Sequence, residues 1–256
     1  MTKILFQKRF VILWWFFGLC GLGVLMMYFF PAFKSGNIVS SFSSLPPPVQ
    51  KLIGDTTSWT TISGYISQQI FSLRVPLLVI ILSIYIFSNL TSVDERKGIT
   101  ETSLALNNSR SKILINKILA AFVIIIIGII AIDLGILLGL HLIHYTFSYH
   151  QLLILSLNSF LICLDFGLIS LVFGSLSGRA GLTIGVPSVF AFLSYLLTTM
   201  VGTVESLKTV EKLSLFHYYS TGLTINKKYI LILVIFGFFA LIISLIGFNR
   251  RDIRTN

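Results

Sequence analysis

The sequence predicts an all-α integral membrane protein with six transmembrane helices. Of its 256 residues, 55% are hydrophobic and only 11% are charged, and the hydrophobic residues gather in long blocks. A soluble domain of this size needs no such amount of apolar sequence, whereas a helix needs about 20 apolar residues to cross the hydrocarbon core of a bilayer. Composition and block length together therefore favour a single transmembrane domain over residues 1–256.

Six apolar blocks are long enough to span the membrane. They cover 11–30, 72–91, 118–140, 151–176, 180–203 and 229–248. The fourth and fifth blocks are separated by only a few residues around Gly178 and Arg179, which predicts a tight helical hairpin. Small residues recur every four positions in the third block, at Ala131, Gly135 and Gly139, a spacing that lets helix backbones approach closely.

The basic residues predict the orientation of these spans. If the amino terminus lies inside, 12 of the 19 Lys and Arg residues fall on the cytoplasmic side and 7 on the outer side. This bias favours a multi-pass protein of the plasma membrane with both termini in the cytoplasm. The net charge of +10 does not indicate nucleic acid as a partner, because the basic residues are scattered between apolar blocks and form no stripe.

The longest charged stretch between two apolar blocks is 91–117. Its ionisable residues are Asp94, Glu95, Arg96, Lys97, Glu101, Arg110, Lys112 and Lys117. A charge at the centre of the bilayer costs about 2.5 to 3.5 kcal/mol on insertion scales, so this stretch is expected to be an aqueous loop. Gly98 can end the preceding helix, and Ile99, Thr102 and Leu106 share one face of a short following helix.

This loop resembles the first cytoplasmic loop of ABC-2 type permeases, the membrane subunits of a class of ABC transporters. The family carries a pattern close to Glu-x-x-Gly-Thr-x-Glu-x-x-Leu-Ala-x-Pro-x-x-Arg, followed by Lys at the start of the next helix. The chain matches it at Glu95, Gly98, Glu101, Leu104, Ala105, Arg110 and Lys117, and departs from it at Ile99 and Asn107. Two shorter stretches, Ser214 to Tyr219 and Phe248 to Ile253, are also similar to family segments.

The resemblance implies an ABC-2 (type V) exporter-like permease whose coupling helix docks into a cleft on a separate ATPase subunit. In that picture Glu95 and Arg96 fix the loop to the helix ends, and Ile99 and Leu106 fill the cleft. Glu101 makes a polar contact with the ATPase, and Gly98, Leu104 and Arg110 complete the coupling region. Two permease subunits, identical or different, and two ATPase subunits are the expected assembly.

No catalytic motif is found in the chain. It has no Gly-x-x-x-x-Gly-Lys-Ser/Thr phosphate loop, no His-Glu-x-x-His and no Gly-x-Ser-x-Gly. We therefore expect no enzyme activity and no cofactor on this chain, with ATP and magnesium bound by the partner ATPase. His141, His144 and His150 cluster after the third block, but no carboxylate or thiol completes a metal site beside them, and interfacial histidines are expected.

Three polar residues interrupt the apolar blocks: Asp133, Asn158 and Asp165. Acids inside a membrane face protein or water because exposure to lipid is costly. At about 1.5 Å per residue, Asp133 and Asn158 lie at the same depth, so a structural hydrogen bond between them is expected. A role for the acids in proton or substrate handling is the alternative.

The expected cargo is an amphipathic or hydrophobic molecule, because the spans are rich in Phe, Leu and Ile and hold few charges. Among ABC-2 permeases the chain looks most like the membrane subunits that export amphipathic peptide toxins, such as phenol-soluble modulins, and confer immunity to them. Two other interpretations stay open. One is a proton-coupled secondary transporter that uses Asp133 or Asp165, and the other is an immunity protein that binds a peptide without moving it.

Overall fold

The computed structural model describes residues 1–35, 57–100, 109–201 and 204–251. Within these ranges all regular structure is helical, and six helical segments are long and apolar enough to cross a membrane. They are α2 (Arg9–Lys34), the second span (Ile62–Arg96), α9 (Arg110–Leu142), α10 (Tyr149–Ser177), α11 (Ala180–Met200) and α13 (Lys227–Arg250). The expected class, an all-helical membrane protein with six spans, is confirmed.

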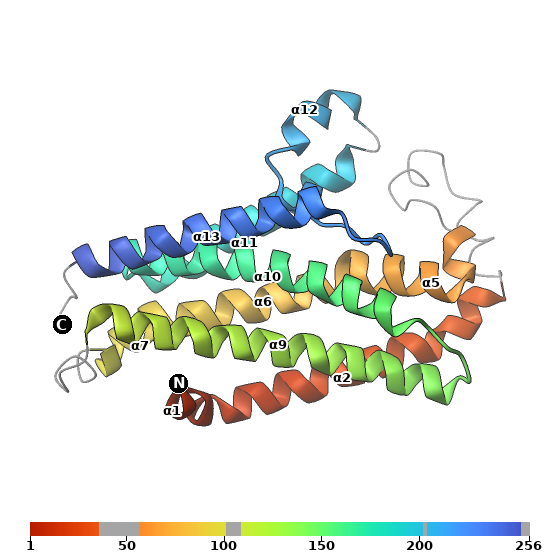
Figure 1. Ribbon diagram of the computed structural model, residues 1–256, viewed down its shortest axis with the longest axis horizontal. Helices are drawn as coiled ribbons and strands as arrows, with labels where there is room; N and C mark the ends of the chain where they lie inside the picture. The colour runs from red at the N-terminus through yellow and green to blue at the C-terminus, as the bar shows by residue number, and fades with distance from the viewer. Residues whose placement is uncertain (36–56, 101–108, 202–203, 252–256) are drawn as a thin grey trace.

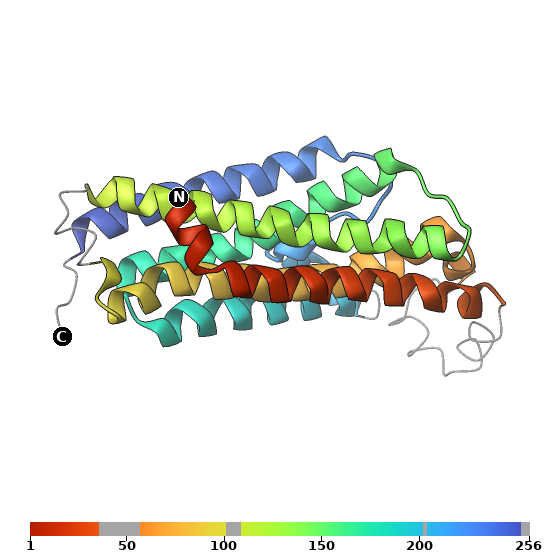
Figure 2. The same cartoon turned by 90° about the horizontal axis from the view of Figure 1, so that it is seen from below.

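The six spans run side by side and alternate in direction (Figure 1). One end of the bundle holds α1 (Thr2–Gln7), α7 (Asp94–Arg96), the start of α9 and the end of α13, and we call it the terminal end. The opposite, distal end holds α5 (Ile62–Gly64) and the connection between α9 and α10. Figure 2 shows α1 as a separate short helix at an angle to α2. The first helix and the end of α13 thus lie at the same end of the bundle, as expected for an even number of spans.

The second span is one long helix assembled from several helical types. It contains α5, a π-helix η2 (Tyr65–Arg74), α6 (Val75–Ser88), a second π-helix η3 (Asn89–Val93) and α7. Pro76 lies inside it and has no backbone N–H, so a carbonyl one turn earlier loses its partner. In a π-helix the N–H of residue 76 would bond the carbonyl of residue 71, five positions earlier. Because Pro76 has no N–H, the Phe71 carbonyl instead accepts a hydrogen bond from the hydroxyl of Tyr219.

The second and third spans extend furthest beyond the limits that the hydropathy predicted. The second covers 62–96 instead of 72–91, and the third covers 110–142 instead of 118–140. The expected loop of 91–117 therefore shrinks to 97–109, of which 101–108 lie outside the described residues. The prediction stopped each helix at its first polar residues, whereas those residues continue the helix and pair with one another across the bundle.

Helix α10 is the most buried span, and α2 and α11 are the least buried. The core around α10 includes Leu155, Ile162 and Phe166, each at 0% exposure. Glycines allow the close contact of α2 with α9, because a Cβ at Gly23 would lie 2.8 Å from the backbone of Gly135. The small-residue ridge expected in the third span thus packs inside the subunit.

A short helical segment between α11 and α13 packs on the side of the bundle (Figure 1). It contains η4 (Glu205–Leu207), α12 (Lys208–Glu211) and η5 (Leu215–Tyr218). Ser214 is buried, and its hydroxyl donates a 2.8 Å hydrogen bond to the Ser194 carbonyl of α11. Tyr219 shares a 2.9 Å hydrogen bond with Ser159 of α10, so the segment is attached to three spans.

Candidate functional site: the charged terminal end

The turn between the second span and α9 begins at Gly98, whose φ is +71°. A left-handed residue is the usual way to end a helix, and glycine adopts it without strain, so the predicted helix end at Gly98 is confirmed. Ile99 and Thr100 resume helical geometry after it. Ile99 is 39% exposed although it is apolar. This places an accessible hydrophobic side chain directly after the turn.

A buried ion pair joins the second span to α9 beside this turn. The Lys117 ammonium lies 3.3 Å from the Asp94 carboxylate, and the two side chains are 7% and 11% exposed. The same ammonium donates to the Thr100 hydroxyl at 3.0 Å. Because a buried charge is strongly destabilising without its partner, this group of three residues holds the two helices in one relative position.

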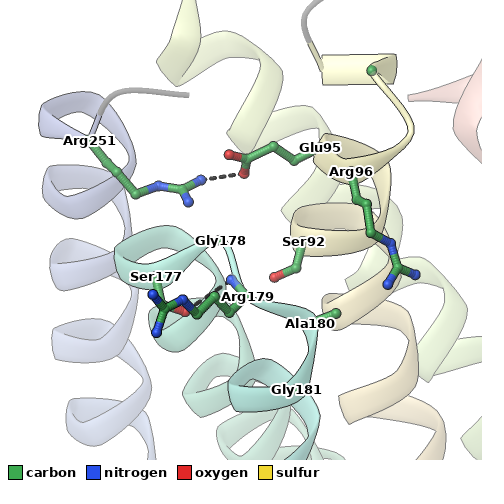
Figure 3. Close-up of a pocket in the computed structure, with 10 residues that line it drawn as sticks. Ser92, Glu95, Arg96, Ser177, Gly178, Arg179, Ala180, Gly181 and Arg251 are labelled. Atoms are coloured by element: carbon green, nitrogen blue, oxygen red, sulfur yellow. Dashed lines mark hydrogen bonds and ion pairs between the residues drawn. The ribbon is translucent and has the colours of Figure 1, made fainter. Parts of the chain in front are cut away.

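A second ion pair joins the second span to the end of α13. The Arg251 guanidinium contacts the Glu95 carboxylate, and both side chains are mostly buried (Figure 3). Arg110, the first residue of α9, donates to the Arg251 carbonyl at 2.7 Å. Ser111 and Asn249 add a polar contact between the same two helices. Three spans are thus connected within one small region.

A hydroxyl network continues the connection to α11. Ser92 and Thr183 share a 2.6 Å hydrogen bond between the second span and α11. The Thr183 carbonyl accepts a 2.8 Å hydrogen bond from Ser170 of α10. All three side chains are buried, at no more than 1% exposure, so none of these bonds competes with water.

A cavity of about 390 Å³ lies between these elements (Figure 3). It is lined by Ser92, Glu95, Arg96, Gly98, Ser177, Gly178, Arg179, Ala180, Gly181 and Arg251. Arg251 is neutralised by Glu95, whereas the exposed side chains of Arg96 and Arg179 have no acidic partner among the described residues. The cavity is therefore polar, positively charged and placed at the end of the spans.

Several residues of the expected coupling region meet at this site. Glu95, Arg96 and Gly98 line the cavity, and Arg110 contacts Arg251 beside it. Ile99 follows the turn. Glu101, Leu104 and Leu106, together with most of the expected coupling helix, lie outside the described residues.

The partners of these charges were not predictable from the sequence. The stretch Phe248 to Ile253 was noted without a contact between Arg251 and Glu95, and Asp94 and Lys117 were expected in water. Pairing at a separation of 156 residues leaves no periodic signal in a single sequence. The only indication in the sequence was that acidic residues at the end of the second span and basic residues at the ends of α9 and α13 fall at the same end of the bundle.

The expected hydrogen bond between Asp133 and Asn158 is wrong. Asp133 instead accepts a 2.8 Å hydrogen bond from Ser156, and Asn158 donates to the Ser220 carbonyl at 2.9 Å. The depth estimate was sound, since Ser156 and Asn158 are only two residues apart. The direction of the side chains around the helix decides the partner. Residues two apart on a helix point to different faces, so Ser156 faces Asp133 and Asn158 does not.

Asp165 is buried in the middle of α10, at 2% exposure, facing α13. One of its carboxyl oxygens has no hydrogen-bond partner within the described structure. The other lies where a side chain at Gly237 would point, at 2.9 Å from a Cβ built there. A glycine at position 237 thus makes room for this acid between two spans.

No family description, curated protein or solved structure matches this chain. The structure by itself describes a multi-pass membrane protein with six candidate spans and a charged cavity at the terminal end.

Proposed function

We propose that this chain is the permease subunit of an ATP-driven exporter of the ABC-2 type, which moves an amphipathic or hydrophobic molecule across the plasma membrane. ATP and Mg²⁺ belong to a separate ATPase subunit that docks at the terminal end, and a second permease subunit completes the pathway. The terminal end faces the cytoplasm in this proposal, in keeping with the distribution of basic residues.

One observation carries the proposal. The turn at Gly98 lies beside two buried ion pairs, Asp94 with Lys117 and Glu95 with Arg251, that link the second span, α9 and α13. A protein that pulls or pushes this turn would move three helix ends together, because separating either pair would leave a buried charge without its counter-ion. Such a rigid connection suits the transfer of work from a soluble motor to the spans.

The second span also contains the means to change shape. Its two π-helical segments, η2 and η3, lie near opposite ends of α6. Segments of π-helix are rare and occur often at functional sites. In the proposed cycle, the part between them tilts when the ATPase subunits close, and access changes from one side to the other.

The outer surface of the bundle supports a second subunit. Large apolar side chains are exposed along α2, α11 and α13, among them Phe17, Leu25, Phe192, Leu193, Phe238 and Phe239. Lipid covers such a surface in a membrane, and a second permease subunit would cover part of it.

Photocrosslinking at Ile99 tests the docking of an ATPase. A photoreactive amino acid replaces Ile99 in the full chain, expressed in its native cells, and adducts are identified by mass spectrometry. We expect an adduct with a soluble protein that contains a phosphate-binding loop, and none from the same label at Tyr149, which is 72% exposed at the distal end. Adducts at Tyr149 alone would contradict the proposal.

A coupling variant tests the function itself. Glu101→Lys combined with Leu106→Asp is expected to uncouple ATP hydrolysis from transport in the reconstituted complex while membrane insertion stays normal. Full transport by this double variant would count against an ATPase docking at this turn.

Asp165 supports a second candidate, a proton-coupled secondary transporter. A carboxyl that is buried between two spans, with one oxygen unpartnered among the described residues, is the kind of group that carries protons in transporters. In that case transport follows the proton gradient, needs no ATPase and disappears in Asp165→Asn. Transport by Asp165→Asn at the normal rate, with ATP required, would leave the exporter as the better proposal.

A further inference from the structure

Two adjoining cavities form a groove between the second span and α11, toward the distal end. The first has about 230 Å³ and is lined mainly by apolar side chains: Leu73, Leu77, Ile80, Ile81, Ile84, Ser188, Ala191, Phe192, Tyr195 and Phe216. The second has about 480 Å³ and is lined mainly by polar ones: Trp59, Gln68, Gln69, Ser72, Leu73, Arg74, Tyr195, Thr198, Thr199, Phe216, Tyr219 and Thr221. They share Leu73, Tyr195 and Phe216, so the groove has an apolar half and a polar half.

Arg74 is the one charged residue that lines either half, as far as the described residues go. Its Nη1 donates to the backbone and side-chain oxygens of Gln69, the latter at 2.8 Å. Its other N–H donors have no partner in the described structure, and the side chain is half-buried. Within the described structure this guanidinium has free donors and faces no carboxylate, so it is complementary to an anion.

The depth of Arg74 places this charge at a membrane surface. Arg74 precedes Arg96, at the terminal end of the same span, by 22 residues, or about 33 Å of helix. The hydrocarbon core is about 30 Å thick, so the two arginines lie near its opposite boundaries. The apolar half then extends from Arg74 toward Ile84, about 15 Å into the hydrocarbon.

The width of the apolar half limits what can enter it. A helix with its side chains is about 10 to 12 Å across, which a cavity of about 230 Å³ cannot enclose. A single extended hydrocarbon chain fits this shape better. Leu77 and Ile81 are 46% and 49% exposed, so they offer apolar surface that such a chain would cover.

We infer that this groove binds one molecule of an anionic single-chain amphiphile. Its carboxylate or phosphate head lies against Arg74 and its tail lies between α6 and α11, beside Leu77, Ile81 and Phe192. The inference rests on the proposed function in naming the class of molecule that is exported, whereas the binding itself requires no ATPase.

Binding of dodecanoate tests the site. The full chain is reconstituted in phosphatidylcholine nanodiscs at pH 8, where the carboxylate is ionised, and binding of radiolabelled dodecanoate is measured. We expect one saturable site, which dodecanol occupies roughly tenfold more weakly because it lacks the charge. Nonsaturable binding, or equal affinity for the two ligands, would overturn the inference.

Substitution of Arg74 locates the head of the ligand. Arg74→Gln is expected to lower the affinity for dodecanoate roughly tenfold and to leave that for dodecanol unchanged, whereas Arg74→Lys keeps most of the affinity. Lys228→Gln is the matched control, because it removes a positive charge from the start of α13, outside the lining of both cavities. An unaltered affinity in Arg74→Gln would place the ligand elsewhere.

Filling the apolar half locates the tail. Ala191→Trp is expected to weaken dodecanoate and dodecanol equally. Should this variant fail to fold, a chain-length series on the wild type replaces it, with hexanoate expected to bind at least tenfold more weakly than dodecanoate. Equal affinity for hexanoate and dodecanoate would show that the apolar half does not bind the tail of the ligand.

The same preparation separates the two proposals. Saturable, Arg74-dependent binding without any ATP-driven transport of dodecanoate would support the ligand site and contradict its place in the export function. ATP-driven transport of other molecules without any binding of dodecanoate would support the export function and contradict the ligand site.

Discussion

Single charged residues at the terminal end act through their partners. Asp94, Glu95 and Lys117 were expected in water, yet each is buried to more than 90%. Placing a charge there is costly, and the cost is recovered only while its partner is present. Removing one member of a pair should therefore lower the free energy of unfolding strongly, whereas removing both members should lower it much less.

The pair of Lys117 and Asp94 allows a test of this point. Lys117→Met leaves the Asp94 carboxylate buried without a counter-ion, so we expect a loss of about 3 to 5 kcal/mol in the free energy of unfolding. Thermal unfolding in detergent can be followed by the reactivity of Cys163, a fully buried free thiol, in a Cys20→Ser background.

The double variant Asp94→Asn/Lys117→Met is the control for that measurement. It removes both charges, and its stability is expected to lie well above that of Lys117→Met. If the double variant were the less stable of the two, the ion pair would not be the cause of the loss.

Residue-level prediction from sequence worked where the backbone alone decides. Gly98 ends a helix because few other residues adopt a positive φ without strain. The partner of Asp133 was predicted wrongly because depth along a helix was considered and direction around it was not. The partner of Glu95 was beyond prediction, since it depends on how six helices pack.

Helix pairs form the next scale, and the α2–α9 contact shows how closely two spans can pack. A Cβ at Gly135 would overlap the carbonyl oxygen of Cys20 on α2. Gly21, on the same helix as Cys20, has nothing within 4 Å of the corresponding position. These two glycines therefore differ in packing although both lie in apolar spans.

Gly135→Ala is expected to destabilise the protein by about 1 to 3 kcal/mol, because the backbones of α2 and α9 must separate. Gly21→Ala is expected to leave stability unchanged or to raise it by up to about 1 kcal/mol, since alanine favours a helix. The thiol-reactivity assay on Cys163 compares the two variants. Equal effects would mean that the α2–α9 contact does not limit stability.

The second span offers another element-scale prediction, at the carbonyl of Phe71. Tyr219→Phe removes the hydroxyl that bonds this carbonyl, and we expect a loss of about 1 to 3 kcal/mol with faster hydrogen exchange in 65–75. Tyr218→Phe is the control, because that hydroxyl bonds the Lys212 carbonyl at an exposed position. A larger effect of Tyr218→Phe would contradict the role given to Tyr219.

This contact also has a defined pH dependence. Burial raises the pKa of Tyr219 above its ordinary value of about 10, so the hydroxyl keeps its proton in the folded chain. The stability that depends on the protonated form is fully present below about pH 10 and is lost as the pH rises beyond it. Wild type and Tyr219→Phe should therefore differ by a constant amount between pH 6 and 9.

The spans themselves were predictable from sequence, and their limits were not. Long apolar blocks identify a helix that crosses a membrane, because only a helix satisfies the backbone groups of a continuous apolar segment within that segment. The extensions at 62–71 and 92–96 carry polar residues, and hydropathy treats these as the end of a span. Only the contacts with neighbouring helices show that the helix continues through them.

At the scale of the whole molecule, the function proposed here depends on which end faces the cytoplasm. The structure brings α1, the turn at Gly98 and the end of α13 to one end, as the alternation of six spans requires (Figure 1). The groove around Arg74 lies toward the other end. A motor at the terminal end and an amphiphile site at the distal end are compatible only if these ends lie on opposite sides of the membrane.

Cysteine labelling in intact cells tests this arrangement. In a chain with Cys20→Ser and Cys163→Ser, a single cysteine is placed at Ile99 or at Tyr149, which are 39% and 72% exposed at the terminal and distal ends. We expect a membrane-impermeant maleimide to label Tyr149→Cys in intact cells and Ile99→Cys only after permeabilisation. The reverse pattern would place the turn at Gly98 outside the cell, where no ATP-hydrolysing subunit could reach it, and the exporter proposal would fail while the packing described above would stand.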